Sequence, residues 1–452
     1  MRRWVYNGFW VWLLTLSSLQ AVSEPKSLWG IPISEYDSRR QALSKALESD
    51  QMAVLMAENE APTRLRFRQE NHFMYLTGVE TPNAVLVILP EDSPLEERTI
   101  LFLQRRSRAS QIFEGPAPEP NEATRQELQV DAVRDRREFN EFLKETLTHH
   151  PRVVANRPAR TALPEIACAL ETEAQVGTVE GMMARLRVVK SPAELALMRR
   201  AAQISAEAHQ ALARRVAPRV YEYELEAALL ETYRRNGAQR EAYPPIIGSG
   251  PNALILHYNA NKRQMQAGEL VLVDAGAEYS YYAADITRTY PVSGKFTPRQ
   301  RELYNAVLEA MQLAEREAKP GVTLRDLHNK VVEFFRNHPL RAKDENGEER
   351  TLDTFFVHGL SHMVGMDVHD PGQSAPLQSG MVFTIEPGLY IPSEKIGIRI
   401  EDTYLMTERG AVSFTPNLPR QASDIERLVQ QGRRAPQQPR QPAQPRQPAQ
   451  RR

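Results

Sequence analysis

Residues 269–290 read "ELVLVDAGAEYSYYAADITRTY" and decide how the second half of the chain folds. The apolar run "LVLV" predicts a buried strand that ends at Asp274, residues 276–280 predict a turn, and the remainder predicts a return strand. The return strand alternates in character, which places Asp285 and Thr287 on the same face. A carboxylate at the end of a buried strand is unfavourable unless a positive group pairs with it. The stretch therefore predicts a hairpin whose two aspartates need a positive partner.

Two later stretches also place an acid beside a predicted strand. Residues 381–390, "MVFTIEPGLY", predict a strand that leads into Glu386, after which proline and glycine turn the chain. Residues 397–406, "GIRIEDTYLM", alternate, so that Arg399 and Glu401 share one face while the isoleucines share the other. The three stretches are therefore expected to point their acids toward one site.

A histidine-rich stretch supplies the remaining candidates for that site. Residues 355–372 read "FFVHGLSHMVGMDVHDPG". His358 and His362 lie four apart, as in a zinc-binding helix of the pattern His-Glu-x-x-His, but position 359 is glycine where that site needs its glutamate. Aromatic and β-branched residues among glycines favour strands and turns over a helix. A metal site here therefore depends on carboxylates from elsewhere in the chain.

The length of 452 residues predicts two domains. Between about residues 30 and 180, helical segments alternate with short apolar ones, which predicts an α/β domain. Ser191 and Glu194 then form a capping box with proline at the first helical position, and we place the domain boundary just before it, near residue 184. A similar helix start recurs at Thr297. The second half interleaves helices with antiparallel strand pairs, which predicts an α+β domain with pairs at residues 269–290, 355–370, 380–391 and 396–407.

The two ends of the chain differ from its middle. The first 23 residues have the layout of a secretory signal peptide, with two arginines, an aromatic and leucine-rich run, and small residues at the cleavage position. An uncleaved anchor helix is the alternative, although the apolar run is short and contains Asn7 and Gly8. Residues 430–452 repeat glutamine, proline and arginine, which predicts a disordered tail. We expect a secreted or periplasmic protein with domains over residues 24–183 and 184–429.

The formal net charge of zero conceals an uneven distribution. Two arginines lie in residues 1–23 and six in residues 433–452, with no acids in either, so residues 24–432 carry a formal net charge of −8. An acidic body argues against binding to nucleic acid, whereas the basic tail could contact an anionic envelope surface. Cys168 is the single cysteine, so no internal disulfide can form, and we expect a buried thiol on a helix.

The candidate ligands resemble, in their order and setting, those of the pita-bread metallopeptidases: Asp274, Asp285, His362, Glu386 and Glu401. The stretches "HGLSHMVGMDVHD" and "TIEPGLYI" are similar to the signatures of the aminopeptidase P and prolidase families. In the first half, "FRQENHFMYLTG" resembles the creatinase-type amino-terminal domain. The resemblance covers about residues 30–428. It implies an α/β N-terminal domain followed by an α+β pita-bread catalytic domain.

The resemblance implies two metal ions that Asp285 and Glu401 bridge. Asp274 would complete the ligands of one ion, and His362 and Glu386 those of the other. Four carboxylates and one imidazole suit manganese or another hard divalent ion. Two such ions lower the pKa of a shared water, and Glu386 is expected to carry its proton to the leaving nitrogen.

Further residues match the family around this site. His257, in "LILHYNAN", and His369 match histidines on the substrate side, where each can donate a hydrogen bond to the substrate's carbonyl oxygen. His358 matches another active-site histidine, with a packed core residue as the alternative. Arg399 is expected to steady the metal-binding carboxylates, with an exposed strand arginine as the alternative, and Tyr390 to assist it.

Three functions remain open at this point. The leading interpretation is an Xaa-Pro aminopeptidase, which removes the N-terminal residue from peptides with proline in second position. The short span from Glu386 to Glu401 favours it over a prolidase, which cleaves Xaa-Pro dipeptides. A metal-free pita-bread binding module is the third, and the complete ligand set argues against it. The resemblance also implies a homo-oligomer, either a dimer or a tetramer.

Overall fold

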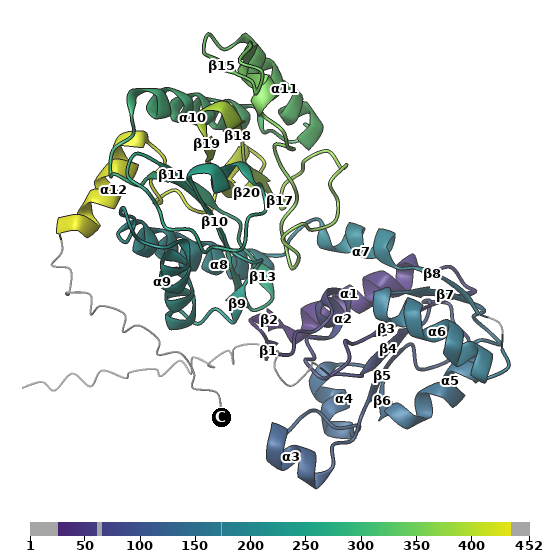
Figure 1. The fold of residues 1–452 in the computed structure, drawn as a ribbon. Coiled ribbons are helices and arrows are strands. Elements are labelled where there is room, and N and C mark those ends of the chain that lie inside the picture. Colours follow the sequence, from purple (N-terminus) through teal and green to yellow (C-terminus); the bar gives the residue numbers. More distant parts are fainter. Residues whose placement is uncertain (1–25, 61–65, 173, 435–452) are drawn as a thin grey trace, which may run out of the picture.

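The computed structural model describes residues 26–60, 66–172 and 174–434. They fold into two domains, the first built around one sheet and the second around several small sheets (Figure 1). The predicted signal peptide at residues 1–23 lies outside the described residues, as do residues 435–452 of the predicted tail. No helix among the described residues is both long and apolar enough to span a bilayer.

The described part of the first domain forms a six-stranded sheet between two layers of helices (Figure 1). Its central strand alternates: Met52 and Val54 face one core, and Ala53 and Leu55 face the other. This arrangement confirms the predicted α/β class. In sheet order, the strands are β6 (Ala132–Asp135), β5 (Thr99–Leu103), β4 (Val85–Ile88), β3 (Gln51–Met56), β7 (Arg152–Ala155) and β8 (Gln175–Thr178). The hairpin β1 (Ser27–Leu28) and β2 (Ile31–Pro32) accompanies the helices α1 (Ile33–Ala46), α2 (Asn71–Thr77), α3 (Arg108–Glu114), α4 (Glu122–Leu128), α5 (Phe139–Thr146), α6 (Arg157–Ala169) and α7 (Glu180–Arg187).

The single cysteine is not buried. Cys168 lies on α6, as predicted, but its side chain is exposed, so the expected buried thiol is wrong. The buried stripe of this helix follows Ala159, Leu163 and Ala167 at helical spacing, and Cys168 lies one position off that stripe.

The junction between the domains follows α7. The predicted boundary at residue 184 lies inside that helix, and residues 188–191 connect it to α8 (Pro192–Ala213). The predicted capping box is present, because the Ser191 hydroxyl accepts from the Glu194 backbone and the Glu194 carboxylate accepts from the Ser191 backbone.

The second domain packs long helices against small antiparallel sheets (Figure 1), which confirms the predicted α+β class. Its further helices are α9 (Glu222–Arg235), α10 (Pro298–Glu317), α11 (Leu324–Asn337) and α12 (Ala422–Arg434). Its strands are β9 (Arg240–Glu241), β10 (Ile246–Ser249), β11 (Leu270–Asp274), β12 (Ala277–Tyr279), β13 (Tyr282–Ala283), β14 (Thr287–Pro291), β15 (Arg341–Lys343), β16 (Glu349–Thr351), β17 (Val382–Ile385), β18 (Gly388–Ile391), β19 (Ile396–Arg399), β20 (Asp402–Thr407) and β21 (Gly410–Ser413).

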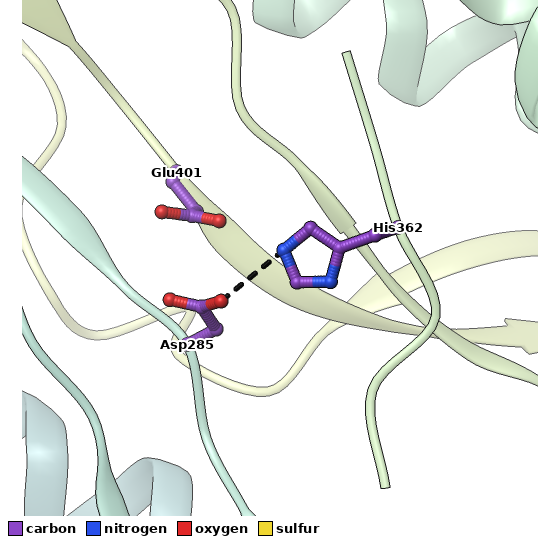
Figure 2. Close-up of side chains that lie close together, drawn as sticks. All are labelled: Asp285, His362 and Glu401. Atoms are coloured by element: carbon purple, nitrogen blue, oxygen red, sulfur yellow. Dashed lines mark ion pairs between the residues drawn. The ribbon is translucent and has the colours of Figure 1, made fainter. Parts of the chain in front are cut away.

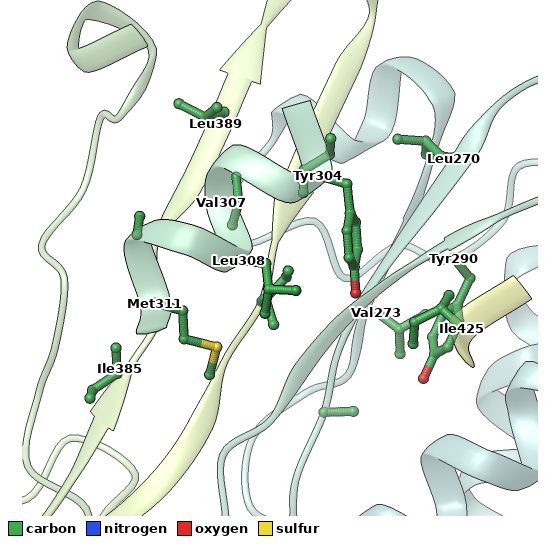
Figure 3. Close-up of a cluster of buried hydrophobic side chains, with 14 of the residues drawn as sticks. Leu270, Val273, Tyr290, Tyr304, Val307, Leu308, Met311, Ile385, Leu389 and Ile425 are labelled. Atoms are coloured by element: carbon green, nitrogen blue, oxygen red, sulfur yellow. The ribbon is translucent and has the colours of Figure 1, made fainter. Parts of the chain in front are cut away.

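Helix α10 anchors the core of this domain. Tyr304, Val307 and Met311 lie on its buried face, beside side chains of β11 and the strands near residue 385 (Figure 3). The helix begins with a capping box at Thr297, as the sequence predicts. The apolar face of α10 thus packs against the strands that end in the candidate acids.

The predicted hairpin at residues 269–290 is more broken than expected. Strand β11 ends at Asp274, as predicted, but the turn lies at Ser280 and Tyr281, where φ is positive, and not across residues 276–280. Asp285 lies in irregular chain between β13 and β14. The reason is a close crossing: the carbonyl oxygen of Ala284 would lie 1.7 Å from a Cβ at Gly276, so the return segment passes directly over the glycine.

The expected strand pairs beyond residue 355 are also rearranged. Residues 355–370 form no pair of strands, so that prediction is wrong. Their backbone instead runs beside β17, where Thr384 donates to His362 and Glu386 donates to Leu360, both at 2.9 Å. The strands within residues 380–391 do not pair with each other, because β17 pairs with β20 and β18 with β19.

The predicted tail, residues 430–452, includes residues that belong to the last helix. Helix α12 continues to Arg434, so the first residues of the stretch 430–452 are helical. Gln430 donates to the carbonyl of Gly294 at 3.0 Å, and Arg433 donates to the carbonyl of Ser293 at 2.8 Å. These side-chain contacts with the β14–α10 connection extend the helix past the expected boundary.

Candidate metal centre and active site

Antiparallel pairing brings three of the acids together. Asp274 is paired in register with Thr287, and Thr287 forms a bridge with Glu401. Asp285 lies beside them because the Thr403 hydroxyl accepts from its backbone N–H at 3.1 Å and donates to its carbonyl at 2.8 Å. Residues far apart in the sequence therefore present carboxylates at one point, since directly paired strand residues lie side by side.

The five predicted metal ligands all line one cavity of about 480 Å³. Asp285, His362 and Glu401 each offer one ligand atom, and these atoms lie within 4.8 Å of one another (Figure 2). The Nε2 of His362 lies 3.3 Å from Asp285 Oδ2 and 3.4 Å from Glu386 Oε1. The fifth, Asp274, contacts the same tyrosine hydroxyl as Asp285.

The His362 ring has a fixed orientation. Its Nδ1 lies 3.1 Å from the carbonyl oxygen of Met363, and because a carbonyl can only accept, Nδ1 carries the proton. Burial opposes charge on the ring, but its hydrogen bond with Asp285 and the charges of Asp285 and Glu386 overcome this and raise the pKa of His362 to about 9. The Nε2 atom therefore attracts positive charge, which a metal cation can supply in place of a proton.

The carboxylates are destabilised as a group. Burial raises the pKa of Asp274, and repulsion from Asp285 adds to the effect although Arg399 opposes it. Burial also raises the pKa of Glu386 to about 8. Burial and the neighbouring acids raise the pKa of Glu401 well above its ordinary value. These raised pKa values mean that the residues around the site supply too little positive charge to stabilise the ionised carboxylates.

The donor set fits divalent cations. Among the residues that line the cavity, Arg399 is the one guanidinium or ammonium group facing four carboxylates. The cavity is also oxygen-rich: four carboxylates line it, and the Nε2 of His362 lies within 3.4 Å of two of them. Hard divalent ions prefer this set of ligands.

Arg399 and Tyr390 connect His358 to the acids. Arg399 is 3% exposed, which rules out the exposed strand arginine, and its guanidinium binds Asp274. It also donates to the Tyr390 hydroxyl at 2.6 Å and to Thr287 Oγ1 at 3.1 Å. His358 lies at the end of this network, and burial, with the charge of Arg399, lowers its pKa to about 4. His358 is therefore neutral and part of the hydrogen-bond network.

His257 and His369 lie at the open side of the cavity. Both line it, and both are exposed. The His369 ring packs edge-on against His362, with ring centroids 4.3 Å apart. Partial desolvation at the cavity wall and the charge of His362 lower the pKa of His369, which keeps it neutral and able to donate one N–H.

Sequence reasoning missed Tyr243. Its hydroxyl lies 2.7 Å from Asp274 Oδ1 and 2.5 Å from Asp285 Oδ1, between the two acids. The residue precedes two prolines in the connection between β9 and β10, where neither periodicity nor a charged neighbour marks it. Its aromatic ring and hydroxyl in an otherwise turn-like segment were the one available signal.

Comparisons with known proteins agree on both domains. Residues 196–408 match Metallopeptidase family M24, and residues 36–155 match the N-terminal domain of aminopeptidase P. The chain is 34% identical over 430 residues to the Xaa-Pro aminopeptidase of Escherichia coli (strain K12), covering 87% of this chain and 97% of that protein. Aminopeptidase P from E. coli with the inhibitor Pro-Leu gives a TM-score of 0.81 at 34% identity, over 89% of this chain and 99% of that one. The Zn-substituted E. coli aminopeptidase P in complex with product gives 0.80 at 33% identity, with the same coverage.

Proposed function

The chain belongs to metallopeptidase family M24, and we propose on that premise how its cavity cleaves peptides. The protein is an Xaa-Pro aminopeptidase, a hydrolase that removes the N-terminal residue from peptides with proline in second position. One observation carries the mechanism: four carboxylates and one imidazole from separate segments meet in a single cavity of about 480 Å³. Peptide hydrolysis by metals needs such a preassembled set of ligands.

Two divalent ions would be held by five residues. Asp285 and Glu401 would contribute ligands to both ions, Asp274 to one, and His362 with Glu386 to the other. The oxygen-rich donors favour manganese or a similarly hard ion. When bound, such ions lower the pKa of water and polarise the substrate's carbonyl group.

Glu386 carries the proton. Its carboxylate is half-buried at the cavity wall, with Oε1 3.4 Å from His362 Nε2 and Oε2 3.8 Å from His358 Nδ1. From this position the carboxylate can accept a proton from the attacking water and deliver it to the departing nitrogen. The proline nitrogen must be protonated before it can leave.

His257 and His369 bind the substrate. Both lie at the open side of the cavity, and a neutral imidazole there can donate to the carbonyl oxygen as negative charge develops on it. Arg399 and Tyr390 orient Asp274 from behind, since the guanidinium contacts both that carboxylate and the tyrosine hydroxyl. His358 supports the Tyr390 hydroxyl from the other side.

The test compares two substrates on one enzyme preparation. The protein is stripped with a chelator, reloaded with manganese, and assayed on an Xaa-Pro-Xaa tripeptide and on Gly-Pro. We expect activity to return with manganese and the tripeptide to be cleaved much faster, with release of its first residue. Faster cleavage of Gly-Pro would indicate a prolidase, and no cleavage of either would indicate a binding module.

Export and assembly form part of the proposal. The signal-like first 23 residues support a secreted or periplasmic location, and the family resemblance supports a dimer or tetramer. Residues 435–452 are basic and free of acids, which supports weak contact with an anionic envelope surface at low salt. Cell fractionation and analytical ultracentrifugation of the mature protein test these points.

A further inference from the structure

The loop of residues 365–370 forms one wall of the catalytic cavity and carries His369. No hydrogen bond joins the His369 ring to any other residue that the structure describes. The ring contacts His362 at 4.3 Å between centroids, and it also borders a second cavity of about 440 Å³ that adjoins the catalytic one, since Tyr243, Val368 and His369 line both. Because the exposed ring has room in both cavities, packing alone does not fix it, and the loop backbone must set its position.

The loop is fastened by a buried arginine at the end of α7. Arg187 is 2% exposed. Its Nη2 lies 2.6 Å from Asp367 Oδ2 and 2.5 Å from Asp370 Oδ1, so one guanidinium binds acids on both sides of His369. Lys190 binds the other oxygen of Asp370 at 2.9 Å. The loop closes tightly around this carboxylate, because a Cβ at Gly365 would lie 2.5 Å from it.

Other residues of the first domain also hold this loop in place. The Nη1 of Arg187 lies 3.0 Å from His72 Nδ1, and because arginine only donates, that nitrogen is the acceptor. Asn71 donates to Asp367 Oδ1 at 2.7 Å, and Arg68 donates to the carbonyl of Met366 at 3.2 Å. The outer side of the loop is therefore held by residues of the N-terminal domain.

We propose that Arg187 is a positioning residue for His369, through which the N-terminal domain sets the geometry of substrate binding; this inference rests on the proposed role of His369. Asp370 is buried between Arg187 and Lys190, so its release would separate a buried carboxylate from one of its two buried cations, and Asp367, which is half exposed, is held by Arg187 and by Asn71. The loop between Asp367 and Asp370 is thereby held in one conformation. His369 then meets the substrate carbonyl in a fixed place, and a displacement of about 1 Å is enough to lower turnover severely.

The test is a double-mutant cycle between Arg187→Met and His369→Ala. With an Xaa-Pro-Xaa tripeptide and manganese, we expect Arg187→Met to lower kcat by about tenfold or more, with metal content unchanged. In the His369→Ala background the same substitution should have no further effect on kcat, because the group it positions is gone. Arg187→Lys keeps the positive charge but loses the planar pair of guanidinium donors, so it should retain more activity than Arg187→Met.

A matched control separates positioning from stability. Arg40 is 1% exposed, lies on α1 of the same domain, and donates to backbone carbonyls that include that of Leu76. Arg40→Met should lower the melting temperature as Arg187→Met does, yet leave kcat unchanged. If Arg187→Met does not fold, Asn71→Ala, which removes one hydrogen bond to Asp367, is carried through the same cycle.

The outcomes are distinguishable. Equal losses of kcat in the wild-type and His369→Ala backgrounds would overturn the positioning role while leaving the proposed function intact. Full activity of His369→Ala on its own would instead contradict the proposed role of His369, and the inference with it. Loss of metal in Arg187→Met would also contradict the inference, because none of the proposed ligands touches Arg187.

Discussion

Tyr390 donates a hydrogen bond to His358, with 3.0 Å between its hydroxyl oxygen and Nε2. The direction follows because His358 Nδ1 lies 2.7 Å from the carbonyl oxygen of Gly359 and must donate to it. The lone pair on Nε2 of His358 is thus occupied by the hydrogen bond from Tyr390. Four residues later, His362 points its own Nε2 at Asp285 and Glu386. Two histidines at helical spacing therefore have separate tasks, because this stretch is not a helix.

The first prediction separates these two histidines. His362→Ala should lose about one metal ion per chain, since it removes the imidazole nitrogen that faces the acids. His358→Ala should keep both ions and lose activity only in part. Metal analysis by mass spectrometry after gel filtration measures the difference. Equal loss of metal from both variants would show that they act as a paired ligand motif.

The second prediction concerns the acid that lies between the other ligands. Asp285→Asn removes negative charge at the point where Tyr243, Thr403 and His362 converge. Metal content and activity on an Xaa-Pro-Xaa tripeptide should fall together, with activity reduced by about a hundredfold or more. His369→Ala is the matched comparison, because it should lose turnover by about a hundredfold with both ions retained. Two ions still bound to Asp285→Asn would contradict the bridging role.

The third prediction tests the proton carrier. Glu386→Gln keeps an oxygen at the cavity wall but cannot accept a proton from water. Activity should drop by about a hundredfold or more while at least one metal ion remains, because the other four ligands are unchanged. A variant that retains more than a tenth of wild-type kcat would assign proton transfer to another group.

The fourth prediction uses the pH dependence of stability. Burial alone would raise the pKa of Asp370, but Arg187 and Lys190 outweigh it and lower that pKa below its ordinary value. A depressed carboxyl pKa adds stability that is present above the unfolded value of about 4 and is lost as the pH falls through the folded value. Asp370→Asn should therefore show a shallower fall in the free energy of unfolding than the wild type between about pH 5 and pH 3.

The control for this experiment is an exposed ion pair. The pKa of Asp50 is also lowered, by its hydrogen bond with Arg152, but half of the Asp50 side chain is exposed to solvent. Solvent screening makes such pairs weak, so Asp50→Asn should follow the wild-type curve closely. Parallel curves for the wild type and Asp370→Asn would show that the buried pair does not contribute to acid sensitivity.

The fifth prediction locates the end of the fold. Removal of residues 435–452 should leave activity and the melting temperature unchanged, as expected from their composition. Removal of residues 430–452 should lower the free energy of unfolding by about 1–3 kcal/mol, because it deletes the contacts of Gln430 and Arg433 with the carbonyls of Gly294 and Ser293. Thermal melts of the two truncations should differ, and identical melts would place the boundary back at residue 430.

Local chemistry made much of the site readable from the sequence. A carboxylate at the end of an apolar strand, as at Asp274, signals a need for positive charge wherever the strand lies. Side-chain alternation placed Arg399 and Glu401 on one face, and the structure shows both contacting the same group, Thr287. These features depend on a few neighbouring residues and on strand periodicity, so no tertiary information is required to recognise them.

Tertiary structure alone decided how the segments meet. Strand β17 pairs with β20 across 16 intervening residues, Tyr243 reaches two acids from an unmarked connection, and Arg187 reaches the His369 loop from the other domain. Residues 355–370 look like a strand pair by composition but hydrogen-bond to β17 instead. Strand partners and long-range ion pairs are selected by packing of the whole chain, because a local pattern specifies which face a residue occupies but not which distant segment will lie against that face.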